Sequence, residues 1–112
     1  MDFLPLFFDL RGSPVLVVGD SDAAARKVEV LLKAQCSVRL LAESLTNVQL
    51  SSLADAGDIL FLQGDASALE NDTLWEHVRL CIAASSDDSF NEMLSKLARE
   101  RAIPVNVVNR VD

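Results

Sequence analysis

The sequence predicts an α/β domain built on a doubly wound parallel sheet of about five strands in the order 3-2-1-4-5, with helices on both faces. Two observations lead to this fold class. Continuous apolar runs alternate with segments of helical periodicity, which favours crossover connections between parallel strands. The first apolar run also ends at a glycine that precedes a helical segment, as in turns that hold phosphate groups.

The first half of the chain shows the change of periodicity clearly. Residues 14–18 (P-V-L-V-V) are continuously apolar, as expected for a strand buried on both faces. Residues 22–33 then carry apolar side chains at helical spacing, and Asp22 fits the N-cap position. A second strand is expected at 37–42, followed by a helix over 47–56 that ends at a glycine.

The second half repeats the alternation. Pro104 separates the last helix from the last strand, because proline cannot continue a helix. The elements expected here are a strand at 58–62, a turn at 64–67 with a short helical piece to about Trp75, a strand at 79–84, a helix capped by Asp87 or Asp88 and ending at about Arg101, and a strand at 105–108.

Composition limits the possible partners and locations. The chain has 112 residues, 50% of them hydrophobic, so residues 1–112 are expected to form one domain. Seventeen acidic against 10 basic side chains give a net charge of -7, which argues against nucleic acid or an anionic membrane surface as a partner. The chain contains no apolar run of ~18 residues and its start lacks a basic signal region, so a cytoplasmic protein is expected.

The cysteines and the histidine do not suggest a metal site. Cys36 and Cys81 are far apart and each lies in an apolar stretch, so two buried, reduced thiols are expected. His77 is the only histidine, and a zinc cluster of the usual Cys/His kind cannot be built. His77 is expected to be solvated.

Residues 18–24 (V-G-D-S-D-A-A) lie where a Rossmann-like nucleotide-binding turn is expected. The pattern of that turn is G-x-G-x-x-G/A, in which Gly19 takes the first position and an alanine the last. Ser21 stands at the middle position, and Asp20 and Asp22 add carboxylates that repel an anion unless they point away. A purely structural turn is the alternative. The residues predicted to contact a nucleotide here are Gly19, Asp20, Ser21, Asp22 and Ala23.

An acidic residue follows the second strand. An acid near the position of Glu43 often accepts a hydrogen bond from the ribose 2′-hydroxyl of NAD, and a solvated loop acid is the alternative. Arg39, within the strand, is the only basic residue close to it in sequence, so NAD rather than NADP is expected as the cofactor. Ser44 is predicted to contact the same part of the cofactor.

The fourth strand closes with small residues. Ala84, Ser85 and Ser86 leave room for a nicotinamide ribose, and the two hydroxyl groups can hydrogen-bond to it. A Ser/Asp cap at the start of the next helix explains Ser86 and Asp87 equally well, and both roles can hold at once.

Beyond these features, the chain resembles a known family. Residues 2–12 (D-F-L-P-L-F-F-D-L-R-G), the V-L-V-V-G run and A-R-K at 25–27 resemble the N-terminal dehydrogenase/chelatase domain of siroheme synthase and free-standing precorrin-2 dehydrogenases. Residues 82–91 and 105–109 are similar to the family's A-A-T-D-D-x-x-x-N and V-N-V-V-D. The leading element is the most specific, because other Rossmann-like domains lack it.

The resemblance implies an activity and its partners. The implied reaction is NAD-dependent oxidation of precorrin-2, an acidic tetrapyrrole, to sirohydrochlorin, usually followed by insertion of ferrous iron to give siroheme. A homodimer is implied for the full-length protein, whose dimerisation segment and further small domain have no counterpart in these residues.

The sequence departs from the family at two places. The family's G-G-G loop is Gly19-Asp20-Ser21 here. The final aspartate of V-N-V-V-D, the implied acid/base group of both steps, corresponds to Asn109, and an amide cannot accept a substrate proton near neutral pH.

Three interpretations therefore stay open. The first is the NAD-binding domain of a precorrin-2 dehydrogenase. The second is a catalytically degenerate module that holds NAD or a tetrapyrrole without turnover, which Asn109 favours. The third is a ligand-sensing Rossmann domain like those regulating potassium transport, which the residues at 64–67 suggest and the N-terminal element argues against.

Overall fold

A five-stranded parallel sheet forms the centre of the computed structural model, which describes residues 11–108. Its strand order, β3-β2-β1-β4-β5, confirms the predicted doubly wound fold. The order reverses between β1 and β4, and in such sheets a crevice opens beyond the carboxyl ends of these two strands. The strands are β1 (Pro14–Val18), β2 (Ser37–Ala42), β3 (Leu60–Gln63), β4 (Leu80–Ala83) and β5 (Val105–Val107).

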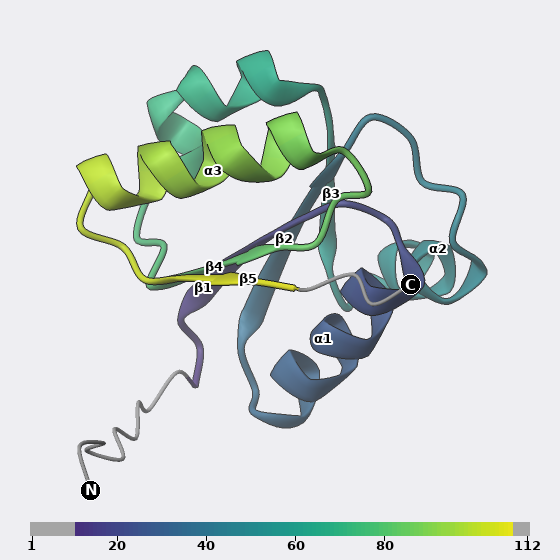
Figure 1. Ribbon diagram of the computed structural model, residues 1–112. Coiled ribbons are helices and arrows are strands. Elements are labelled where there is room, and N and C mark those ends of the chain that lie inside the picture. Colours follow the sequence, from purple (N-terminus) through teal and green to yellow (C-terminus); the bar gives the residue numbers. More distant parts are fainter. Residues whose placement is uncertain (1–10, 109–112) are drawn as a thin grey trace, which may run out of the picture.

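Helices cover both faces of the sheet (Figure 1). α1 and α2 lie on one face, and α3 lies with two 3-10 helices on the other. The helical piece predicted before Trp75 is two short 3-10 turns, because Asn71 Oδ1 accepts the Thr73 N–H at 3.0 Å and starts a new turn. The helices are α1 (Asp22–Lys33), α2 (Val48–Asp55), η1 (Ala66–Glu70), η2 (Asp72–Trp75) and α3 (Asp88–Glu100).

The third strand begins at Leu60, later than the predicted start at Asp58. The Asp58 N–H donates to the Leu53 carbonyl at 2.9 Å, so this residue still closes the end of α2. Gly57, at φ +80°, supplies the left-handed backbone that this helix end requires.

The central strand β1 is fully enclosed. Residues 15–18 have no exposed surface, and their side chains alternate between the two cores. Val15 and Val17 pack with the α1 and α2 layer, whereas Leu16 and Val18 pack with α3 and the 3-10 helices. This burial on both faces explains why β1 is a continuous apolar run, and it fixes the position where the chain leaves the sheet at Gly19.

Trp75 fastens the 3-10 segment to α3. It is buried, its Nε1 donates to the Leu69 carbonyl at 2.8 Å, and the Arg101 guanidinium lies 4.7 Å from its ring centroid. Arg101 also reaches Asp72 Oδ1 at 3.1 Å. His77, two residues on, has a side chain that is 79% exposed, as predicted.

Both cysteines are buried and free, as predicted. Cys81 lies in β4 with no exposed surface, and burial raises the pKa of its thiol to about 12. Burial also raises the pKa of the Cys36 thiol. Across residues 11–108, no helix has the length and apolar character needed to cross a membrane.

Candidate functional site

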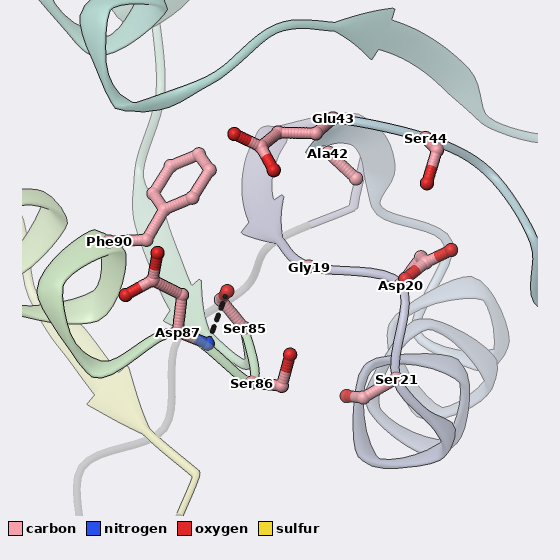
Figure 2. Close-up of a pocket in the computed structure, with 10 residues that line it drawn as sticks. All are labelled: Gly19, Asp20, Ser21, Ala42, Glu43, Ser44, Ser85, Ser86, Asp87 and Phe90. Carbon is pink, nitrogen blue, oxygen red and sulfur yellow. Dashed lines mark hydrogen bonds between the residues drawn. The ribbon is translucent and has the colours of Figure 1, made fainter.

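A cavity of about 370 Å³ opens at the carboxyl end of the sheet (Figure 2). The segments that follow β1, β2 and β4 form it, which is the place where a doubly wound sheet binds ligands. Side chains of Asp87 and Phe90 lie on one side in Figure 2, and those of Asp20 and Ser21 on the other. The lining residues are Gly19, Asp20, Ser21, Ala42, Glu43, Ser44, Ser85, Ser86, Asp87 and Phe90.

Most residues singled out from the sequence meet at this cavity. Three do not line it: Asp22, Ala23 and Ala84. Asn109 lies outside the described residues. The residues brought together as predicted are Gly19, Asp20, Ser21, Glu43, Ser44, Ser85 and Ser86.

The sequence did not mark Ala42, Asp87 and Phe90 as part of the site. Ala42 and Asp87 each adjoin a predicted contact residue, and that adjacency is the signal that could have found them. Phe90 belongs to the apolar line of α3, and it is indeed 5% exposed, so its periodicity alone predicts a core residue.

Gly19 allows two loops to touch. Its φ of +113° disfavours any side chain, and a Cβ built there would lie 2.5 Å from the Ala84 carbonyl oxygen and 2.7 Å from the Ser85 Cα. Its N–H donates to the Leu41 carbonyl at 2.9 Å. The β1–α1 loop therefore crosses directly over the start of the β4–α3 loop, which only glycine permits.

Ser21 fastens the same crossing. Its hydroxyl donates to the Ala84 carbonyl at 2.8 Å and accepts the Ala24 N–H at 3.1 Å. Ser21 is extended, at φ -73° and ψ 168°, and is the N-cap of α1. The predicted N-cap, Asp22, is wrong by one residue, because Asp22 already has helical backbone as the first residue of α1. At the middle position of the turn, the hydroxyl is thus occupied by structural bonds.

The two aspartates of the β1–α1 loop are bound to the β2–α2 loop. Asp20 Oδ2 accepts the Thr46 N–H at 2.7 Å and the Thr46 hydroxyl at 2.9 Å. Asp22 Oδ1 accepts from Asn47 Nδ2 at 3.0 Å. These bonds stabilise the two carboxylates and hold Asp22 away from the cavity, although Asp20 still contributes to its lining.

Asn91 holds the β4–α3 loop in place. Its Oδ1 accepts the Ser85 N–H at 3.0 Å and its Nδ2 donates to the Ser85 carbonyl at 2.9 Å. The Ser85 hydroxyl accepts the Asp87 N–H at 3.0 Å, and Asp87 Oδ1 accepts the Ser89 N–H at 2.9 Å. Asp87 is therefore the N-cap of α3, one of the two predicted candidates.

The cavity is acidic. Carboxylates of Asp20, Glu43 and Asp87 line it, and none of the lining residues in the described part of the chain is basic. Arg39, which precedes Glu43 in sequence, donates from Nη1 to the Leu74 carbonyl at 2.9 Å and lines a different cavity along β3. The N-terminus of α1, whose first backbone N–H groups carry partial positive charge, begins beside this cavity.

The described residues contain no group of three or more His, Cys, Asp or Glu side chains placed to hold a metal ion. Among the cavity carboxylates, the Asp20 oxygen already accepts two hydrogen bonds from Thr46. The polar groups at this cavity are therefore carboxylates, serine hydroxyls and backbone amides. The carboxylates and hydroxyls can bond the hydroxyl groups of a sugar, whereas the carboxylates repel a phosphate.

A doubly wound sheet whose first strand leads through a glycine into the N-terminus of a helix is the arrangement typical of dinucleotide-binding domains. Over residues 6–112 the chain matches the family described as "Putative NAD(P)-binding", and it belongs to that family. A nicotinamide cofactor is thereby supported.

The relatives named siroheme synthase confirm the resemblance seen in the sequence. The chain is 44% identical over 115 residues to siroheme synthase of Neisseria meningitidis serogroup C (strain 053442), covering 100% of this chain and 22% of that protein. It is 41% identical over 109 residues to the enzyme of Actinobacillus succinogenes (strain ATCC 55618 / DSM 22257 / CCUG 43843 / 130Z), covering 97% and 22%. The chain thus spans 22% of the length of these curated relatives.

Solved structures show the same fold at low identity. SirC, a precorrin-2 dehydrogenase, superposes with a TM-score of 0.77 at 18% identity, covering 98% of this chain and 51% of that chain. Saccharopine dehydrogenase of Saccharomyces cerevisiae gives 0.68 at 18% identity, covering 90% and 22%. At these identities the likeness concerns the fold.

Proposed function

We propose that this chain is the NAD-binding domain of a siroheme-synthase-type precorrin-2 dehydrogenase. One observation carries the proposal: the glycine–helix turn at residues 19–21 and Glu43 line the same cavity at the switch point of the sheet. In doubly wound sheets these two features hold the pyrophosphate and the ribose of a dinucleotide. The similarity to siroheme synthases supplies the substrate class.

The β1–α1 loop is the proposed pyrophosphate contact. The first N–H groups of a helix have no partner within it. In α1 the Ser21 hydroxyl accepts a hydrogen bond from the Ala24 N–H. Within the described residues the N–H groups of Asp22 and Ala23 have no other partner. These two residues lie just beyond the cavity lining, so a phosphate held there would extend from the cavity to the end of the helix, where the positive end of its dipole lies. Gly19 brings this loop against the opposite wall without a Cβ in the way.

Glu43 is the proposed contact for the adenosine ribose, and Ser44 lies beside it. A carboxylate accepts hydrogen bonds from a ribose diol but repels a 2′-phosphate. The one basic side chain nearby in sequence, Arg39, is bound to the Leu74 carbonyl and lines a different cavity. These contacts favour NAD over NADP.

The β4–α3 loop is the proposed site for the nicotinamide half. Ser85 is fixed by Asn91, and Ser86 is exposed at the cavity. Ala84 has a small side chain, and its carbonyl accepts a hydrogen bond from the Ser21 hydroxyl. The small side chains leave room for the ring, which when bound accepts a hydride from the substrate.

The tetrapyrrole and ferrous iron are proposed substrates of the whole protein, on the strength of the family resemblance. Asn109 takes the position of the family's acid/base aspartate, just after β5, whose end is marked by the Val108 N–H donating to the Ala83 carbonyl at 2.9 Å. We also propose that residues 1–112 act as one domain of a cytoplasmic homodimer.

Calorimetric titration with NAD+ and NADP+ tests the proposal. We expect saturable NAD+ binding below millimolar concentration. NADP+ should bind at least about tenfold more weakly, because the Glu43 carboxylate repels its 2′-phosphate; a tenfold difference corresponds to about 1.4 kcal/mol. Glu43→Gln should reduce the difference in affinity between NAD+ and NADP+, while the control Glu100→Gln, at the far end of α3, should not. No heat at millimolar NAD+ would contradict the proposal. Trp75 does not line the cavity, so its fluorescence is the weaker probe.

A second function is favoured by Asn109: a module that binds cofactor or tetrapyrrole without turnover. Asn109→Asp in the full-length protein discriminates the two, with NADH production from precorrin-2 as the readout. If activity rises from background to that of a working dehydrogenase, the site is intact apart from this amide. If the variant binds NAD+ as wild type and stays silent, the non-catalytic module is the better account.

A further inference from the structure

The carboxylates around the cavity come from loops that follow different strands. Glu43 follows β2, on the side where a doubly wound sheet takes the adenosine, and Asp87 caps α3 on the β4 side, where the nicotinamide half lies. Asp20, on the loop between them, accepts two hydrogen bonds from Thr46. The described lining residues contribute no positive side chain on either side.

The two redox forms of the cofactor differ in charge at one end only. The oxidised nicotinamide ring is a cation, and transfer of a hydride onto it gives a neutral ring, while the pyrophosphate charge stays the same. A carboxylate near the ring therefore attracts the oxidised form and gains nothing from the reduced one. A carboxylate at the adenosine end interacts almost equally with both forms.

We propose that Asp87 determines redox-state preference: it makes this site bind NAD+ in preference to NADH, which favours uptake of oxidant and release of reduced product. The proposal rests on the proposed function of the cavity. Its geometric basis is the position of the Asp87 side chain at the cavity wall beside Phe90, opposite Asp20 and Ser21 (Figure 2). The cap bond to Ser89 holds that carboxylate in place.

Asp87 can be neutralised without removing the cap. Asparagine is as good an N-cap as aspartate, and its Oδ1 can still accept the Ser89 N–H. Asp87→Asn thus changes the charge and leaves the start of α3 intact. Asp88→Asn is the matched control, because it removes the same charge one residue on, from an exposed side chain outside the cavity lining.

The experiment measures the dissociation constants of NAD+ and NADH for the wild type, Asp87→Asn, Asp88→Asn and Glu43→Gln by calorimetry at low salt. We expect the wild type to favour NAD+, and Asp87→Asn to shrink the ratio of the NADH to the NAD+ constant by about twofold to fivefold, the size of an exposed charge contact. Asp88→Asn should leave that ratio within about 1.5-fold, and Glu43→Gln, at a proposed cofactor contact, should change it less than Asp87→Asn does. The Asp87→Asn effect should fade at about 0.5 M salt, where charges are screened.

Two results overturn this inference and leave the proposed function standing. In the first, both nucleotides bind but the ratio of their dissociation constants is unchanged in Asp87→Asn. In the second, that ratio changes equally in Asp88→Asn. A wild type that binds neither nucleotide overturns the proposed function as well. Thermal melting of each variant, with Asp87→Asn expected within about 2 °C of wild type, shows that α3 is still capped.

Discussion

The loop after β1 and the loop after β4 touch at Gly19, but they are held in place in different ways. The β1–α1 loop depends on bonds to distant segments: Asp20 is bound to Thr46 and Ser21 to the Ala84 carbonyl. The β4–α3 loop is held by the first turn of its own helix, through Asn91. The Ser21–Ala84 bond belongs to both loops, so the two loops differ in their other anchor: Thr46 of a distant loop for the first, and the first turn of its own helix for the second.

The point of contact should be the most sensitive position. Gly19→Ala is expected to destabilise the fold by about 3 kcal/mol or more, because strain at positive φ adds to a Cβ 2.5 Å from the Ala84 oxygen. Gly57→Ala is the matched control: its φ is +80° but a Cβ there meets nothing within 4 Å, so only the backbone term of about 1 kcal/mol applies. Urea denaturation of both variants measures the difference. Equal losses would show that the loops do not need to touch.

Removing the local clamp comes next. Asn91→Ala should cost about 2–3 kcal/mol, because it leaves the buried Ser85 N–H and carbonyl without partners. Asn106→Ala, at an exposed position in β5, should stay within about 0.5 kcal/mol. Hydrogen exchange of the Ser85 amide gives a second measurement, with fast exchange expected only in Asn91→Ala. Unchanged protection there would mean that the loop has another anchor.

The local clamp and the long-range bonds were not equally predictable. The alternation of apolar and helical segments predicts the strands and helices, and Asp87 is one of two predicted caps, because both depend on neighbours in sequence. The strand order follows from the doubly wound pattern that such an alternation favours. The partners of Asp20 and Ser21 could not be predicted, since Thr46 and Ala84 come close only when the parallel strands are in register. For the same reason, the hydrogen bond from Arg39 to the Leu74 carbonyl could not be predicted.

Cys81, in the strand β4 that precedes the β4–α3 loop, makes the stability of the fold depend on pH. The pKa of the Cys81 thiol is raised from 9.0 to about 12 in the fold, so the unfolded chain loses this proton first as pH rises. Its contribution to stability is complete below pH 9 and is lost as pH rises toward about 12. By pH 10 we expect a loss of about 1 kcal/mol relative to Cys81→Ala, which lacks this titration. Denaturation at several pH values checks it, and parallel curves for the two proteins would contradict it.

The bond between Asp20 of the β1–α1 loop and Thr46 of the β2–α2 loop should have the smallest effect. Asp20→Ala is expected to cost about 0.5–1 kcal/mol, because the Thr46 pairing is exposed. In a double-mutant cycle with Thr46→Ala, the two losses should couple by about the same amount. Asp58→Ala, an exposed aspartate at the other end of the sheet, is the control. Fully additive losses would show that the bond contributes nothing to holding the first loop.

The central claim is that the touching loops form one NAD site, and an amide-resolved NMR titration of the 112-residue chain with NAD+ tests it most directly. We predict saturable shifts concentrated in both loops at once, at Gly19, Ser21 and Ser86, with the amides of α2 largely unmoved. Shifts confined to one loop, shifts elsewhere on the molecule, or no shifts at millimolar NAD+ would contradict the account.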